Sequence, residues 1–261
     1  MRYIVCIKQV PDTTEVQFDP ETKTLRRDGI PSIINPFDAY ALEEALRFRE
    51  ANGGIVTVVT MGPPQAEQAL REAIAMGCDD AWLLTDPSFR GADTLATART
   101  LAAALRLIGE CAVILCGKQA VDGDTAQVGP EIAELLDVPH VTYVRKVREL
   151  TKSEVIVERM VEGGYEVVQS SLPVLLTVVK DINQPRLPTM RGIMRAKRTP
   201  VTKWGIADLG LPAERAGLSG SATEVIRVFT PQMPSGGEMI EGDPEVQVRS
   251  LISRLLVAGV V

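Results

Sequence analysis

The chain has 261 residues, of which 45% are hydrophobic, so it can bury one large core with or without an appendage. Its net charge of −6 and its 4% content of aromatic residues argue against nucleic acid as a partner, and its longest apolar runs are too short to span a membrane. One basic tract, Arg191 to Lys203, stands out from this acidic sequence.

Few residues of the sequence are suited to direct catalysis or to metal binding. The single histidine, His140, follows Pro139 at the expected start of a strand, and the four cysteines show no CxxC spacing. We therefore expect no disulfide, no metal site and no catalytic side chain, and we assign any chemistry to a bound cofactor. The N-terminal residues do not resemble a secretory signal, so we expect a reducing, cytoplasmic location.

The N-terminal half of the chain alternates strands and helices. Tyr3 to Val10 predicts a buried strand, and Glu15 to Asp28 predicts a hairpin-like excursion. Asn35 to Asp38 then starts an amphipathic helix that ends at Gly53. Ile55 to Met61 predicts the second buried strand.

The same alternation continues to Leu136. A helix to Gly77 is followed by a third strand at Ala81 to Leu84 and by a helix that begins at Asp93 or Thr94. A fourth strand, Cys111 to Cys116, precedes the last helix of this series. Such an order predicts an α/β fold with a doubly wound, mostly parallel, Rossmann-like sheet.

The pattern changes from His140 onward. Three segments that alternate apolar and polar residues predict antiparallel strands at the edge of the sheet, at 141–150, 154–161 and 165–170. Leu175 to Lys180 predicts a final buried strand, and Met190 to Lys197 a short helix. Residues 201–261 contain too little periodic apolar sequence to fold alone, so we expect a nucleotide-binding domain over residues 1–200 and a C-terminal arm over residues 201–261 that docks on another surface.

The stretch GKQAVDGDTAQVGP, Gly117 to Pro130, is a candidate phosphate-binding loop. It follows a buried strand and precedes a helix, an arrangement in which the N–H groups of the new helix can bind an anion. Asp122 and Asp124 would repel a phosphate, so we expect them to cap the helix, to accept from ribose hydroxyls or to meet a cation. From the loop alone, an ordinary turn capped by Asp and Thr explains the pattern equally well.

Other loops are expected at the same edge of the sheet. The carboxyl ends of parallel strands meet there, which brings Lys8 to Val10, Met61 to Pro63 and Thr85 to Asp86 beside the candidate loop. The loops Asn35 to Asp38 and Gly91 to Thr97 reach the same edge. Their hydroxyls, amides and carboxylates suit an adenosine-containing ligand better than a bare anion.

Several long motifs occur in a family-specific order along nearly the whole chain: VCIKQVPDT, INPFDAYALEEAL, VTVVTMGPP, GADTLATA, GKQAVDGDTAQVGPEIAE and DINQPRLPTMRGIMRAKRTP. They resemble the beta (small) subunits of electron-transfer flavoproteins, including the related nitrogen-fixation and carnitine-pathway subunits. The resemblance implies a heterodimer with a larger alpha subunit, on which the C-terminal arm docks, and a role in carrying electrons.

The resemblance also implies an adenine-nucleotide site in this subunit. Matching motifs place the phosphates near Asp124, Thr125 and Gln127. The implied cofactor-binding residues are Cys6, Asn35, Pro36, Phe37, Asp38, Met61, Gly117, Lys118, Gln119, Asp122, Gly123, Asp124, Thr125, Gln127 and Val128.

Members of the family differ in the nucleotide that this site holds. Simple carriers hold structural AMP, whereas flavin-bifurcating members hold a second FAD. The segment GADTLATA resembles the bifurcating members and places Asp93, Thr94 and Thr97 near a flavin ring, whose edge needs hydrogen-bond donors and acceptors. We therefore expect FAD here, with NADH as the donor of a hydride and single electrons passing both to the alpha-subunit FAD and to a low-potential acceptor such as ferredoxin or flavodoxin.

The alternative is a simple carrier with AMP, in which Thr94 and Thr97 only cap a helix. Met190 falls where the family has an exposed apolar residue for docking, beside Arg191, Arg195 and Lys197. The partner implied there is an acyl-CoA dehydrogenase or another flavoprotein or quinone reductase. A third hypothesis is an adenine-nucleotide-binding regulatory module without redox chemistry.

Overall fold

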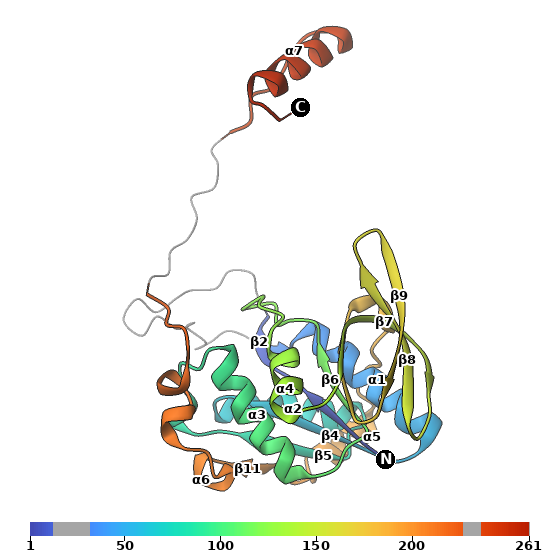
Figure 1. Cartoon of the computed structure of the whole chain (residues 1–261), viewed down its shortest axis with the longest axis vertical. Helices are drawn as coiled ribbons and strands as arrows, with labels where there is room; N and C mark the ends of the chain where they lie inside the picture. Colours follow the sequence, from blue (N-terminus) through green and yellow to red (C-terminus); the bar gives the residue numbers. More distant parts are fainter. Residues whose placement is uncertain (13–31, 227–235, 261) are drawn as a thin grey trace. The chain divides into compact units, whose positions relative to one another are not determined.

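The computed structural model describes residues 1–12, 32–226 and 236–260. Within these residues, nine strands form one sheet and a pair of strands forms a second, small one (Figure 1). The hairpin-like excursion expected at Glu15 to Asp28 lies outside the described residues. From one edge to the other, the large sheet consists of β11 (Thr202–Trp204), β5 (Asp80–Leu84), β4 (Ile55–Met61), β1 (Arg2–Cys6), β6 (Val113–Gly117), β10 (Val174–Val178), β7 (His140–Leu150), β8 (Glu154–Val161) and β9 (Gly164–Ser171).

The pairing is parallel from β11 to β7, and antiparallel only from β7 to β9. β4, β6 and β10 read as near-continuous apolar runs because helices cover both faces of the sheet. β7 and β9 are mostly exposed, with few buried side chains in β7 and none in β9. The predicted α/β class, the mostly parallel sheet and the antiparallel edge strands are confirmed.

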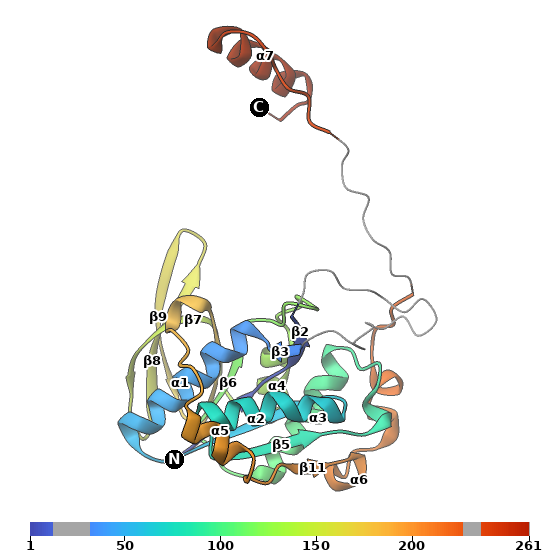
Figure 2. The same cartoon turned by 180° about the vertical axis from the view of Figure 1, so that it is seen from behind.

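Helices pack on both faces of this sheet, and each face has its own apolar core. One core lies under α1 (Pro36–Asn52) and α2 (Glu67–Met76), and α5 (Met190–Ala196) packs beside α2 (Figure 2). The other lies under α3 (Thr94–Ile108) and α4 (Val128–Leu136). The glycines after α1, α2 and α3 end these helices at the expected places.

β10 is placed between β6 and β7, although it follows β9 in the chain. Val174 to Val178 are all buried, and they pair in parallel with β6 on one side and with β7 on the other. Among the described residues, the three antiparallel strands therefore pair with the parallel sheet through β10.

The first strand is shorter than its apolar run predicts. β1 ends at Cys6, and the chain leaves the sheet before β2 (Gln9–Pro11), which pairs antiparallel with β3 (Ser32–Ile34). The backbone N–H of Lys8 donates to the Asp38 carboxylate at 2.7 Å rather than to a neighbouring strand. At Lys8, a side-chain carboxylate therefore replaces a strand-to-strand hydrogen bond. The apolar pattern of Tyr3 to Val10 does not indicate this change.

The chain divides into two compact units after Ile226, beyond the boundary that we expected at residue 200. β11 extends the sheet beside β5, and Leu209, in α6 (Ile206–Leu209), and Ala216 are buried in the core on the α3 side. These residues belong to the first unit because they complete that core. Docking of the remaining arm on an alpha subunit stays a prediction.

In the second unit, the structure describes residues 236–260. These include α7 (Pro244–Val257), in which Asp243 caps the N-terminus by accepting from Val246 N–H. Glu238 pairs with Arg254 of this helix. Across the described residues of both units, no helix is long and apolar enough to cross a bilayer.

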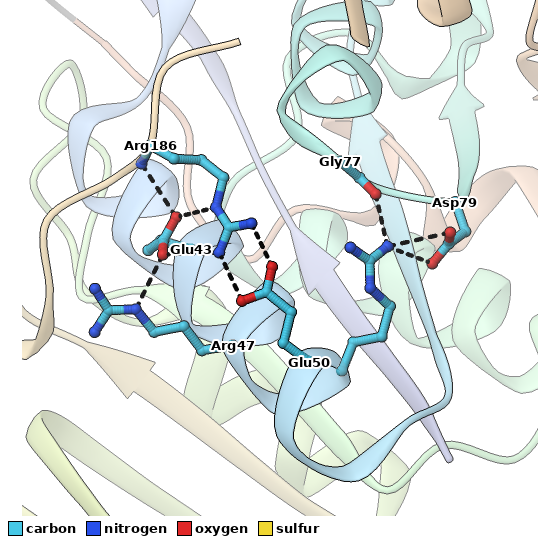
Figure 3. Close-up of polar contacts among 7 residues, drawn as sticks. Glu43, Arg47, Glu50, Gly77, Asp79 and Arg186 are labelled. Atoms are coloured by element: carbon cyan, nitrogen blue, oxygen red, sulfur yellow. Dashed lines mark hydrogen bonds and ion pairs between the residues drawn. The ribbon is translucent and has the colours of Figure 1, made fainter. Parts of the chain in front are cut away.

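α1 buries two glutamates that an ordinary polar helix face would expose. Glu43 is 3% exposed and Glu44 is 7% exposed. Arg186, from the segment before α5, donates to Glu43 Oε2 at 2.8 Å and to Glu50 Oε1 at 2.5 Å (Figure 3). Asn183 donates to Glu44 Oε2 at 2.9 Å. These contacts hold the segment 183–186 on α1.

The charge on these carboxylates depends on Arg186. Burial raises the pKa of Glu43, but hydrogen bonds from Arg186 outweigh this effect and leave the pKa below its ordinary value. The hydrogen bond from Arg186 also lowers the pKa of Glu50. Both groups therefore stabilise the fold most when they are ionised.

We expect Arg186→Leu to lower the free energy of unfolding at neutral pH by about 1 to 3 kcal/mol, because hydrogen bonds to charged groups are lost. The stabilisation is present above the unfolded glutamate pKa of about 4.3, and it is lost as the pH falls through the lower folded-state pKa values. Urea unfolding at neutral and acid pH should therefore show a smaller difference between wild type and variant in acid.

Arg90→Leu is the control for this measurement. Arg90 is exposed and its side chain has no partner among the described residues, so the change should stay within about 0.5 kcal/mol. A difference between wild type and Arg186→Leu that is undiminished in acid would contradict the assignment.

Candidate functional site

The predicted binding residues meet where β1 and β6 end and α1 begins. Cys6 and Cys116 are register partners at the carboxyl ends of these two strands. Pro36 is the first residue of α1, where the fixed φ of proline favours a helix start, and Asp38 follows in the first turn. The edge therefore combines two strand ends with one helix N-terminus.

Asp38 connects these three elements through its carboxylate. Its Oδ2 accepts from Lys8 N–H at 2.7 Å, and its Oδ1 accepts from Gly117 N–H at 3.0 Å. The side chain is buried, which raises the pKa of Asp38 to about 7, although the N–H groups of Lys8 and Gly117 and the Asn35 side chain act to lower it. A buried carboxyl thus satisfies two backbone donors where the strands leave the sheet.

Gly117 is required at this point by the close approach of α1. A Cβ on Gly117 would lie 2.4 Å from Asp38 Oδ1 and 2.6 Å from the carbonyl carbon of Phe37. Only a residue without a side chain allows β6 to end so near to the first turn of α1.

Asn35 fixes the loop that follows β6. Its Nδ2 donates to Gln119 O at 2.8 Å, and its Oδ1 accepts from Val121 N–H at 3.1 Å. Farther along the loop, Asp124 and Ala126 both have positive φ, at 55° and 56°. Two non-glycine residues in this region mark a strained backbone of the kind that occurs at ligand sites.

One predicted carboxylate of the loop has a cation as its partner. Asp122 Oδ1 lies 2.5 Å from Lys8 Nζ, and only 6% of the Asp122 side chain is exposed. Its charge is therefore balanced within the chain. Asp124 is exposed, and its carboxylate accepts from the Gln119 side chain.

Lys118 lies between two aromatic rings next to the loop. Its Nζ is 5.8 Å from the ring centre of Phe37 and 5.3 Å from that of Tyr143, a residue with φ of 59°. Cation–π contacts of this kind hold an ammonium group at a defined position.

A second group of predicted residues lies between the N-termini of α3 and α4. The hydroxyl of Thr94 is 3.0 Å from Glu131 Oε1 and 3.3 Å from Gln127 Oε1. Glu131 Oε2 is buried and has no hydrogen-bond partner among the described residues. Burial raises the pKa of Glu131, against the opposing effect of the Thr94 hydrogen bond.

Asp93 is engaged within the chain. Its Oδ1 accepts from Ala96 N–H and caps α3, and its Oδ2 accepts from the N–H groups of Ala222 and Thr223. Capping α3 and binding residues 222–223 are therefore enough to explain why an acidic residue occupies position 93. The cap that we expected for α3 is present.

The other predicted residues of this edge make fewer polar contacts. Met61 is half-buried at the end of β4, and Thr97 is half-buried on α3 without a side-chain hydrogen bond among the described residues. Gly123, Thr125 and Gln127 are exposed, and Val128 is half-buried.

Sequence reasoning placed Lys8 beside the candidate loop but did not foresee its pairing with Asp122, and it missed Glu131. The partner of Lys8 lies 114 positions away in the sequence, so no local pattern signals the pair. Glu131 sits in the first turn of α4, where an acidic residue is common. Its unpaired oxygen becomes visible only in three dimensions.

The residues predicted for docking lie on α5. Met190 is 77% exposed, and Arg191 and Lys197 are exposed as well. Arg195 donates to the carbonyl oxygens of Ile74 and Cys78, at 2.7 and 2.6 Å, so its guanidinium holds α5 against the end of α2.

Comparison with known proteins places this architecture in a family. The family model described as the electron transfer flavoprotein domain matches residues 22–209. The electron transfer flavoprotein subunit beta of Thermoanaerobacterium thermosaccharolyticum is 53% identical, over 98% of each chain. This chain belongs to the electron-transfer flavoprotein beta-subunit family.

Other relatives of this beta subunit carry different names. The caffeyl-CoA reductase-Etf complex subunit CarD of Acetobacterium woodii is 51% identical over 98% of each chain. The protein FixA of Bradyrhizobium diazoefficiens is 45% identical over 98% of this chain and 91% of its own length. Beta subunits of electron-transfer flavoproteins pair with an alpha subunit, and the family is associated with flavin and adenine nucleotide.

We expect Gly117→Ala to lower the free energy of unfolding of the beta subunit by about 1 to 3 kcal/mol, because the added Cβ overlaps Asp38 and Phe37. Misplacement of the loop after β6 should also reduce the adenine nucleotide that co-purifies with the heterodimer. Urea unfolding and chromatography of the denatured extract measure the two effects.

Gly164→Ala is the matched control, since a Cβ there meets no atom within 4 Å. Unchanged stability and nucleotide content in Gly117→Ala would show that the close approach of β6 to α1 is not needed.

Proposed function

We propose that this beta subunit binds the adenine nucleotide portion of FAD at the edge formed by β1, β6 and the N-termini of α1 and α4, in a flavin-bifurcating electron-transfer flavoprotein that oxidises NADH. The residues that would hold the nucleotide are those predicted from the sequence at this edge, with Lys8 added. When bound, FAD supplies two-electron exchange with a nicotinamide and one-electron exchange with protein partners.

The N-terminus of α4 supports a phosphate position. Its N-cap residue, Gln127, makes no side-chain cap, whereas α3 is capped by Asp93. The N–H groups of Val128 and Gly129 can therefore donate to an anion, Pro130 having none, and the helix dipole favours negative charge there. Lys8 reduces the repulsion that Asp122 would otherwise exert on a phosphate.

The observation that carries the choice of FAD over AMP is the buried, unpaired Glu131 Oε2 beside Thr94. A buried carboxylate oxygen without a donor among the described residues is costly, and we infer that a bound ligand supplies that donor. A flavin ring, which carries an N–H group, is such a donor, and it extends a nucleotide well beyond AMP. Thr94 lies at the start of α3, as the resemblance to bifurcating members implies.

The proposed partners follow from the family and from the relatives. The alpha subunit holds the second flavin and receives the C-terminal arm that follows Ile226. We propose an acyl-CoA dehydrogenase, or a related flavoprotein or quinone reductase, as the partner at α5; the name of CarD, which belongs to a caffeyl-CoA reductase complex, supports a partner that acts on a CoA thioester. Ferredoxin or flavodoxin is the proposed low-potential acceptor. We further propose that the complex works in the cytoplasm.

The runner-up function is a simple carrier with structural AMP. It is favoured by Asp93, both of whose carboxylate oxygens already accept hydrogen bonds from the chain itself, Oδ1 from α3 and Oδ2 from residues 222–223. In that case the beta subunit supports the alpha-subunit flavin and docks acyl-CoA dehydrogenases.

We expect two FAD and little AMP per heterodimer, because Glu131 provides an acceptor that AMP leaves unused. Glu131→Ala should weaken FAD binding in this subunit by about 10- to 100-fold, the effect of losing a hydrogen bond to a charged group, and should lower the FAD content toward one. Chromatography of the denatured extract counts both nucleotides, and NADH should reduce the wild-type complex directly.

Glu134→Ala, on an exposed position of the same helix, is the control and should retain two FAD. One FAD and one AMP in the wild type would refute the bifurcating function and favour the simple carrier. A heterodimer without flavin would refute both and favour a regulatory module.

We expect Met190→Ala to slow electron transfer to a flavoprotein dehydrogenase, since the side chain is 77% exposed and available for docking. The rate constant for transfer should fall by about 5- to 30-fold, equivalent to about 1 to 2 kcal/mol, while the cofactor content stays constant. Stopped-flow kinetics measures it. Leu107→Ala, which removes an exposed side chain from α3, should transfer normally, and equal rates in the two variants would contradict docking at Met190.

A further inference from the structure

A groove of about 880 Å³ lies between the end of α2 and the helix α5. Four arginines and no carboxylate line it, in a chain whose net charge is −6. Its remaining walls are mostly small or apolar. The four arginines are Arg49, Arg191, Arg195 and Arg198.

Among the described residues, a carboxylate neutralises one of the four arginines. Arg49 lies 3.1 Å from Asp79 Oδ2 and also donates to Gly77 O, and Figure 3 shows Gly77 and Asp79 receiving these contacts. Arg195 donates to two backbone carbonyls, which carry no net charge. Arg191 and Arg198 are exposed and have no side-chain partner among the described residues. The groove therefore has an excess of positive charge.

The groove is held in one shape before any partner binds. Gly192 packs so closely on α2 that a Cβ there would lie 2.0 Å from Ala75 O. Arg71 of α2 donates to Ala196 O at 2.6 Å, and Thr189 caps α5 by accepting from Gly192 N–H. Arg186 fixes the preceding segment on α1. A preorganised surface of this kind loses little conformational entropy on binding.

Apolar side chains accompany the arginines. Met194 lines the groove and is 58% exposed, while Met190 and Leu187 are 77% and 86% exposed just before it in the chain. An occupant that carried only charge would leave these side chains in water. The surface is therefore suited to a ligand with both negative and apolar groups.

We propose that this arginine groove binds an acidic, partly apolar segment of a partner protein, with carboxylates at Arg191 and Arg198 and an apolar side chain at Met194. The opposite charge favours such a segment here, whereas the acidic net charge of the chain disfavours it elsewhere. Arginine is suited to this because its guanidinium binds a carboxylate through two parallel hydrogen bonds. The inference rests on the proposed docking at α5, but it does not depend on which nucleotide the subunit holds.

Fluorescence anisotropy with the purified heterodimer tests the proposal. The probe is a short fluorescein-labelled peptide of glutamate and leucine, and the comparison peptide has lysine in place of each glutamate. The wild type should bind the acidic peptide and not the basic one, and the affinity should fall as salt rises. Arg191→Ala with Arg198→Ala should weaken binding by about 3- to 30-fold, as the loss of two exposed ion pairs does.

The double variant Arg90→Ala with Lys152→Ala removes the same charge from exposed positions outside the groove and should bind as the wild type does. Met194→Glu, which adds a negative charge inside the groove, should weaken binding while leaving both arginines in place.

Equal binding by the groove variants and the control would overturn the proposal. Tighter binding of pyrophosphate or of a short oligonucleotide than of the acidic peptide would also overturn it, because the groove would then be a phosphate site. Cofactor counts report on the nucleotide edge and should be the same in all these variants, so failure of the groove and failure of the proposed function are separable.

Discussion

The carboxylate of Asp38 is the contact on which the nucleotide edge depends. It accepts one backbone N–H from Lys8 and one from Gly117, and so it joins the exits of the two central strands to the first turn of α1. An apolar residue at this position would leave two buried donors unpaired, and an amide would place a donor against one of them. A buried acidic group is thus the residue type that satisfies both strand ends, at the cost of its own desolvation.

α1 links this edge to the arginine groove. Its first turn carries Asp38, its middle carries Glu43, and its last turn carries Arg49, which fixes Gly77 at the end of α2. Arg186 then binds the same helix and positions the chain before α5. α1 therefore supports both the surface suited to a nucleotide and the surface suited to a protein partner. A shift of α1 would alter the positions of residues in both surfaces.

The fold could be predicted largely from apolar periodicity and helix-ending glycines. Strands such as Ile55 to Met61 are buried on both faces and therefore form continuous apolar runs in the sequence. Their positions along the chain could be predicted for that reason. Periodicity carries no information on partners distant in sequence. The break in the first strand at Cys6, the pair Lys8 and Asp122, and the use of Arg195 within the chain all depend on such partners. The candidate loop from Gly117 was found because its place after a buried strand is a local feature, whereas the unpaired oxygen of Glu131 is not.

The position of β10 has a consequence for synthesis of the chain on the ribosome. β7, β8 and β9 are made first, and they can form their antiparallel pairs at once because these contacts are local in sequence. In the described residues they pair with the parallel strands through β10, which is made later and must enter between β6 and β7. The edge of β6 therefore stays open until Val174 to Val178 emerge, and the facing edges of β6 and β7 are both unpaired during that interval.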